Sequence, residues 1–198
     1  MLLSNYSGKI LEAGIDEAGR GCLAGPVVAA AVILPPDYQN GLLNDSKKLS
    51  AKQRLLLREQ IEAAAVTWCV GEASVAEIDS VNILQATYLA MHRAIGGLNL
   101  EPEYLLIDGN RFKPYKTLPY TCVVKGDGKY LSIAAASILA KTYRDEMMQD
   151  LAKEYEAFGW EQNAGYPTKK HRAAIADAGA TPHHRQSFRL LPDQLSLL

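Results

Sequence analysis

Four acidic residues stand at the ends of short apolar segments in this sequence: Asp16, Glu17, Asp108 and Asp127. An acid close to a sheet core is unfavourable unless it is paired or bound to a metal, and strand ends are where an α/β scaffold carries its chemistry. No His or Cys accompanies them at ligand spacing, so acids that converge there would form an all-oxygen site, which Mg²⁺ and Mn²⁺ prefer. Two such ions can activate a water and stabilise the leaving oxygen. The pattern therefore indicates metal-dependent phosphodiester hydrolysis.

Each acid on its own also has a simpler explanation. Asp108 precedes a glycine and Asp127 lies between two glycines, and both arrangements are typical of turns. Asp16 and Glu17 could instead pair with Arg20 or another surface base. These two are also neighbours, so on an ideal strand their side chains point to opposite faces. Both reach one metal cluster only if the strand ends, twists or bulges there. The combination of four acids favours a site.

The elements that must position these acids are short strands and capped helices. Apolar runs with turn residues or acids at their ends predict strands at 10–16, 26–34, 66–70, 104–107 and 120–124. Ser50 and Asn82 each precede a Gln by three residues, a capping-box pattern that predicts a helix start. A long helix is expected over 131–157, and a last one starts near Thr168.

Two of these helices carry patterns that indicate how they pack. The helix after Asn82 has one apolar face: Leu84, Tyr88, Met91 and Ile95. The long helix opens with residues 132–140, which are so rich in Ala and Ser that its backbone can pack very close to a sheet. Strands come early and helices alternate after them, so the sequence predicts an α/β fold with a central mixed β-sheet flanked by helices.

The composition is that of an ordinary globular chain. Of the 198 residues 48% are hydrophobic, and the net charge of −1 neither supports nor excludes a nucleic-acid partner, which needs only a local basic patch. Three widely spaced cysteines predict reduced thiols rather than disulfides. The apolar runs are too short for a membrane span. We expect a cytoplasmic monomer with one domain over residues 1–198.

Several sequence blocks, in this order, resemble the ribonuclease HII family: Gly14-Ile15-Asp16-Glu17-Ala18-Gly19-Arg20-Gly21, Asn44-Asp45-Ser46-Lys47-Lys48-Leu49, Ile107-Asp108-Gly109-Asn110, Val124-Lys125-Gly126-Asp127, residues 132–141, and Gly165-Tyr166-Pro167-Thr168. The resemblance spans about residues 13–189. It implies an RNase H-like fold, in which residues from about 160 to 198 form a small helical extension that contributes to substrate binding.

The resemblance also implies the chemistry. Asp16, Glu17, Asp108 and Asp127 would be the catalytic carboxylates, and the first three would hold the divalent metal, Mn²⁺ or Mg²⁺. The family cuts the RNA strand of RNA–DNA hybrids. It also cuts 5′ of single ribonucleotides in duplex DNA, leaving 3′-hydroxyl and 5′-phosphate ends. One departure is Gly128, where Ser or Ala is more usual, which places the role of the Asp127 loop in doubt.

Selecting a ribonucleotide reduces to sensing one 2′-hydroxyl. Glycines in Gly19-Arg20-Gly21 let backbone groups approach a sugar closely, and the resemblance assigns the 2′-hydroxyl to this loop and the junction sugar to Tyr166. A tight turn with a solvated Arg20 and a packing role for Tyr166 are the structural alternatives.

Five basic residues are expected to contact phosphates: Lys47, Lys48, Lys125, Lys141 and Arg144. Lys141 and Arg144 share a helix face, although Lys141 could equally pair with Asp145. His183-His184-Arg185 is expected either to extend the duplex-binding surface or to form a solvated basic tail, and His92 to be structural.

Other classes of protein fit the sequence less well. The spacing Gly19-x-Gly21-x-x-x-Gly25 is similar to a dinucleotide-binding fingerprint, but it leads into a strand where that motif needs a helix. Residues 126–129 only faintly match a phosphate loop. A non-catalytic hybrid-binding module would have little use for the acids. Another RNase H-like nuclease, such as a resolvase or integrase, would lack the Gly-Arg-Gly loop.

Overall fold

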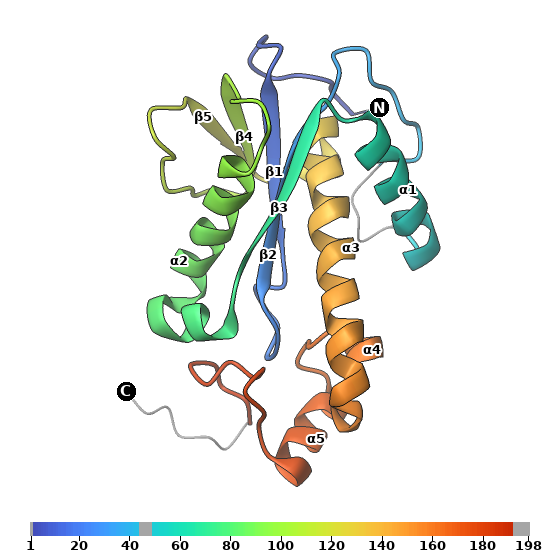
Figure 1. Cartoon of the computed structure of the whole chain (residues 1–198), viewed down its shortest axis with the longest axis vertical. Helices are drawn as coiled ribbons and strands as arrows, with labels where there is room; N and C mark the ends of the chain where they lie inside the picture. Colours follow the sequence, from blue (N-terminus) through green and yellow to red (C-terminus); the bar gives the residue numbers. More distant parts are fainter. Residues whose placement is uncertain (1, 44–48, 192–198) are drawn as a thin grey trace.

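The acids are carried by a mixed five-stranded sheet with strand order β3-β2-β1-β4-β5 (Figure 1). It is seen in a computed structural model, which describes residues 2–43 and 49–191. The strands are β1 (Glu12–Ala18), β2 (Val27–Ile33), β3 (Thr67–Ala73), β4 (Tyr104–Asp108) and β5 (Tyr120–Val123). Strand β1 pairs antiparallel with β2 and parallel with β4. The predicted α/β class with a mixed sheet is confirmed.

Helices cover both faces of this sheet. Helix α2 (Val75–Gly96) lies on one face, and α1 (Ala51–Ala64) and α3 (Leu131–Glu154) lie on the other (Figure 1). Alternate residues of β2 therefore enter different apolar clusters: Ala29 and Ala31 pack toward α2, whereas Ala30 packs toward α1 and α3. Every residue of β2 is buried, which explains its uninterrupted apolar sequence.

The helix starts follow capping chemistry, with one correction. The predicted box of Ser50 with Gln53 caps α1. Helix α2 does not begin at Asn82; it begins after Ser74, which forms its own capping box with Glu77. Asn82 is a kink inside α2 with φ of 70°, and its side-chain oxygen accepts the N–H groups of residues 84 and 85. The Asn82 cap therefore exists, but it restarts a helix that is already under way.

Helix α3 packs directly on β1, as its Ala-rich start predicts. A Cβ added to Gly14 would lie 2.5 Å from the Ser132 carbonyl oxygen and closer still to the backbone of Ser132 and Ile133. Residues 131–140 are all buried. Because α3 runs alongside β1, Ser137 and Lys141 of this helix lie beside the acids near the end of that strand.

The remaining elements follow α3 and lie beyond the end of the sheet (Figure 1). They are η3 (Glu156–Phe158), α4 (Trp160–Asn163) and α5 (Lys169–Ala178), the last capped by Thr168. Phe158 and Trp160 share an apolar cluster with Met148 of α3, so this part is packed onto the end of that helix. No helix within residues 2–43 and 49–191 is long and apolar enough to cross a membrane.

Candidate active site

Asp16 and Asp108 are neighbours because of the β1–β4 pairing. The parallel register places Ile15 opposite Ile107, so the acid that follows each lies at the same level of the sheet. Side chains alternate along β1: Gly14 faces α3, and Asp16 therefore does too. Asp16 and Asp108 both line a hollow of about 260 Å³ against α3. Two acids 92 positions apart in the sequence thus share one site.

Glu17 reaches the same hollow from the other face of the sheet. Ile15 packs in the cluster under α2, and Glu17 follows on that side of β1. Glu17 lines the hollow with Asp16 and also a second one, of about 310 Å³, against α2; Asp108 lines both. The geometric problem posed by adjacent acids is therefore resolved by position, since both stand within two residues of the end of β1 at Ala18 and line one hollow with Asp108.

The local electrostatics favour a bound cation. Asp16 is 6% exposed, and burial raises the pKa of its carboxyl well above the usual range. The nearby charges of Glu17 and Asp108 raise the same pKa further, while a hydrogen bond from Ser137 lowers it. Two like charges beside a buried carboxylate are costly on their own. A divalent cation bound to these oxygens would remove that cost, so the donor set fits a hard metal ion.

The acids are at present held by protein groups. The Gly126 N–H donates to Asp108 Oδ1 at 2.6 Å, the Glu17 N–H donates to Asp16 Oδ1 at 2.7 Å, and Arg20 donates to Glu17 Oε1 at 3.0 Å. Within the described part of the chain, no group of three or more Asp, Glu, His or Cys side chains is already arranged to hold a metal ion.

Asp127 is placed differently from the other acids. It lies in the short turn η2 (Gly126–Gly128) and is 7% exposed. The Gly126 N–H ties this turn to Asp108, but Asp127 does not line the hollow that the other three share. Gly128 faces open space, and a Cβ there would meet nothing within 4 Å. Space therefore does not require the unusual glycine, and nothing in the structure explains it.

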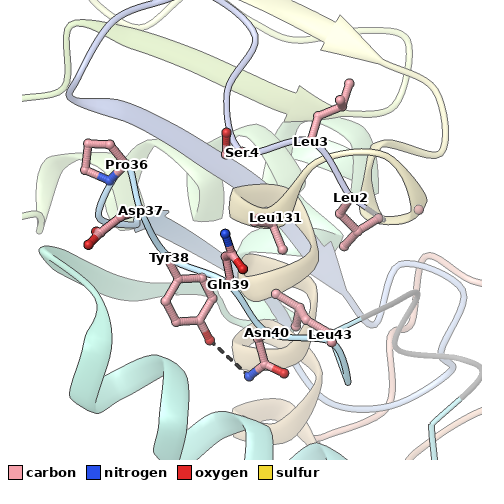
Figure 2. A pocket seen from close by; sticks show the side chains of 12 residues that line it. Leu2, Leu3, Ser4, Pro36, Asp37, Tyr38, Gln39, Asn40, Leu43 and Leu131 are labelled. Atoms are coloured by element: carbon pink, nitrogen blue, oxygen red, sulfur yellow. Dashed lines mark hydrogen bonds between the residues drawn. The ribbon is translucent and has the colours of Figure 1, made fainter.

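A larger cavity is separate from these acids. It has a volume of about 660 Å³ and lies between the N-terminal segment, the loop at 36–43 and the start of α3 (Figure 2). Leu131 at the start of α3 and Gly128 of the preceding turn line one side of it, and Tyr38 lines the loop side. It contains none of the four predicted catalytic acids, so size alone would point away from the chemistry.

The Gly19-Arg20-Gly21 loop forms one wall of the acid-lined hollow. Gly19 has φ of +95°, and a Cβ there would lie 2.5 Å from Cδ of Arg144 and closer to its Nε. Arg144 cannot easily move aside, because its guanidinium donates to the carbonyls of Ala24, Pro26 and Ala164. Glycine is therefore required at position 19 by both its backbone angle and its neighbour.

The predicted phosphate-binding residues differ in burial and in their distance from the hollow. Arg144 is 1% exposed and donates only to backbone carbonyls, so the predicted phosphate contact is wrong. Lys141 does line the hollow, where it pairs with Asp145 at 2.6 Å. Lys125 is exposed beside η2. Lys47 and Lys48 lie outside the described residues.

Tyr166 stands on the same wall as Lys141. Its side chain is 42% exposed, and the Lys141 ammonium lies 5.8 Å from its ring centroid. Partial burial raises the pKa of its hydroxyl, which is hydrogen-bonded to the Cys22 thiol. An exposed ring face next to the acids is available for a ligand.

Ser137 and Arg54 also line the hollow, and neither is among the residues predicted from the sequence. Ser137 hydrogen-bonds to Asp16. A signal for it was present: Ser137 lies four residues before Lys141, on the same helix face. Arg54 is on α1, and no pattern in the sequence connects that helix with the acids.

Both expectations for His183-His184-Arg185 are wrong. His184 and Arg185 are fully buried, and His183 is half-buried, so they form neither a solvated tail nor a duplex-binding surface. Arg185 donates to the carbonyls of Arg20 and Gly25. His92, as expected, has a structural contact, with the Lys113 carbonyl at 2.8 Å.

The burial of His184 predicts a pH-dependent stability. Burial, followed by the nearby His171, lowers the pKa of His184 from 6.5 to about 4. The unfolded chain therefore binds more protons than the folded one below pH 6.5, and stability falls as the pH drops from 6.5 toward 4. The loss from this group is about 3 kcal/mol at most. Urea unfolding of wild type and His184→Gln across this range tests it: the variant should show the shallower pH dependence, and parallel curves would contradict the prediction.

Three acids near adjoining strand ends, in one hollow with a glycine loop and Lys141 of α3, are typical of a metal-dependent nuclease on an α/β sheet. A family model of ribonuclease HII matches residues 13–191. A ribonuclease HII from Bacteroides fragilis is 64% identical over 198 residues, which cover 100% of this chain and 98% of that protein. The chain belongs to the ribonuclease HII family and is a metal-dependent endoribonuclease.

Solved structures agree in fold. The ribonuclease H2 of Pyrococcus horikoshii superposes with a TM-score of 0.75 at 26% identity, covering 90% of this chain and 94% of that one. The structure of a PCNA:RNase HII complex from Archaeoglobus fulgidus matches with a TM-score of 0.75 at 29% identity, covering 93% and 98%. The expected RNase H-like fold is confirmed over nearly the whole chain.

Proposed function

We propose that this chain hydrolyses the RNA strand of RNA–DNA hybrids and cuts 5′ of single ribonucleotides embedded in duplex DNA, leaving 3′-hydroxyl and 5′-phosphate ends. The observation that carries the proposal is one hollow lined by Asp16, Glu17 and Asp108 together with the glycine loop and Tyr166. The acids that would hold the metal and the surface suited to one sugar thus line the same hollow.

In this proposal Asp16, Glu17 and Asp108 hold the divalent metal, Mg²⁺ or Mn²⁺, and Asp127 completes the set of catalytic acids. The metal, when bound, supplies an activated water and charge stabilisation at the leaving oxygen. The protein's part is to hold the acids in place: Ser137 hydrogen-bonds to Asp16, and the Gly126 N–H donates to Asp108.

Substrate selection falls to the glycine loop and Tyr166, which line the same hollow as the acids. Backbone groups of Gly19-Arg20-Gly21 would contact the 2′-hydroxyl, since no side chain stands between them and the hollow at the two glycines. Tyr166 would pack on the sugar at the RNA–DNA junction. Lys141, Lys125, Lys47 and Lys48 would contact phosphates and position the duplex without reading its bases. We propose that the working unit is a monomer.

The decisive experiment uses a 5′-labelled DNA duplex that carries one ribonucleotide. We expect a single cut 5′ of that ribonucleotide in Mg²⁺ or Mn²⁺, and none in EDTA. An all-DNA duplex of the same sequence should stay intact, and a continuous RNA–DNA hybrid should be cut at several positions. Cleavage of the all-DNA duplex would instead favour a resolvase-like or integrase-like nuclease.

Replacing Tyr166 with Ala is expected to lower kcat/KM on the single-ribonucleotide duplex by about 30-fold, the value of one lost stacking contact. Binding of the duplex, measured by fluorescence anisotropy in Ca²⁺, should weaken by no more than about 3-fold, because phosphate contacts supply most of the affinity. Tyr120→Ala, which removes a similarly exposed ring on β5, serves as the control and should change neither value. Equal losses of cleavage and binding in Tyr166→Ala would make Tyr166 a packing residue.

A further inference from the structure

Tyr166 is held from behind by residues that solvent does not reach. His171 Nδ1 lies 2.9 Å from the Tyr166 carbonyl oxygen, which also accepts the Thr168 N–H. The other ring nitrogen of His171 lies 3.0 Å from Trp160 Nε1 and 3.1 Å from His184 Nε2. The side chains of Trp160, His171 and His184 are all fully buried. A chain of directional contacts therefore runs from the C-terminal segment to the backbone of Tyr166.

The proton positions in this series of hydrogen bonds follow from two groups that can only donate, the Thr181 backbone N–H and the Trp160 indole N–H. The Thr181 N–H donates to His184 Nδ1 at 2.9 Å, so His184 carries its proton on Nε2 and directs it at His171. The Trp160 N–H also donates to His171 Nε2, so that nitrogen accepts. His171 must then carry its proton on Nδ1, where it donates to the Tyr166 carbonyl. In this assignment both imidazoles are neutral, and His171 Nε2 is an acceptor shared by Trp160 and His184.

The same C-terminal segment also holds the opposite wall. His184 forms a β-bridge with Ala24, and the Arg185 side chain donates to the Arg20 carbonyl at 3.0 Å, inside the glycine loop. Leu23, next to that bridge, donates its N–H to the Gly165 carbonyl at 2.8 Å. Residues 184–185 thus contact both sides of the surface that we assign to the ribonucleotide.

We propose that the buried His171–His184 pair is a positioning device, which sets the place of Tyr166 relative to the glycine loop and so to the sugar of the substrate. This inference rests on the proposed function of Tyr166. Apolar side chains would fill the same volume without having to satisfy buried nitrogens, and a buried polar group is unfavourable unless it is bonded. Here the His171 ring instead donates to the backbone carbonyl of Tyr166.

The test compares two substitutions of His171 that differ only in where the donor sits. Asn places an amide N–H near the position of Nδ1, whereas Gln extends its amide toward Nε2. On the single-ribonucleotide duplex, His171→Asn should retain kcat/KM within about 3-fold, and His171→Gln should lose about 10-fold, the value of one hydrogen bond. Assays run well below the unfolding midpoint of each variant, so that all are folded.

Each substitution is then repeated in a Tyr166→Ala background. If His171 acts through Tyr166, His171→Gln should cause no further loss there, because the ring that it positions is absent. Losses that multiply, or equal activities of the Asn and Gln variants, would overturn the proposal. His92→Leu, which removes an imidazole–carbonyl contact elsewhere, is the matched control and should be neutral. A wild type that leaves the single-ribonucleotide duplex uncut would instead refute the proposed function.

Discussion

Replacing Asp16 with Asn is expected to reduce kcat for the single-ribonucleotide duplex by about 10³-fold or more, because the metal's several kcal/mol of charge stabilisation depend on this carboxylate. Asp16 is the most buried of the three acids in the hollow and lies between the charges of the other two. An amide keeps the shape of the side chain but carries no charge to bind a cation. Single-turnover cleavage in Mg²⁺ and in Mn²⁺ measures the loss.

The same variant should fold at least as well as wild type in the absence of metal. The pKa of Asp16 is raised mainly by burial and then by the charges of Glu17 and Asp108, so removing its charge relieves repulsion. The thermal midpoint in EDTA should therefore rise or stay unchanged, while the stabilisation that wild type gains from added Mn²⁺ should shrink. Asp37→Asn, an exposed acid away from the hollow, is the control and should leave both kcat and the metal response intact. Near-wild-type turnover of Asp16→Asn would remove Asp16 from the site.

Replacing Gly14 with Ala is expected to destabilise the protein by about 3 kcal/mol or more, at the upper end of overpacking. The added Cβ would enter the backbone of α3 at Ser132 and Ile133. Backbone cannot rotate away as a side chain can, so β1 and α3 would have to separate. Separation would also move Asp16 away from Ser137, and activity should fall in the fraction that still folds.

Urea unfolding followed by circular dichroism measures this loss. Gly41→Ala is the matched control, since a Cβ there meets nothing within 4 Å, and it should change stability by no more than about 0.5 kcal/mol. An unfolding midpoint of Gly14→Ala equal to that of wild type would show that α3 can shift without loss, against the close packing described for β1 and α3.

Local chemistry explains why much of the fold and half of the site could be predicted. A strand buried on both faces needs an unbroken apolar run, so β2 and the acid that ends β1 are visible in a few consecutive residues. The Ser50 cap involves groups three residues apart. The Ala-rich start of α3 predicted its close approach to the sheet, and the structure confirms it at Gly14.

The errors arose where a long-range partner decided the outcome. Arg144 was expected to face phosphates because it shares a helix face with Lys141, yet carbonyls from residues 24, 26 and 164 draw its guanidinium inward. His184 and Arg185 look like a basic tail in sequence and are fully buried in the fold. Their partners lie on α5 and in the glycine loop, and no local pattern contains them.

The sequence by itself determined the kind of chemistry and the elements that carry it, namely acids near strand ends, a glycine loop and capped helices. All of these depend on interactions between residues that are close in the chain. Tertiary structure alone decided which polar side chains line the acid-bearing hollow and which are buried. The physical reason is that a buried Arg or His is stable only when distant backbone groups satisfy its donors. Those groups come together only when β1, α3 and the C-terminal segment have packed.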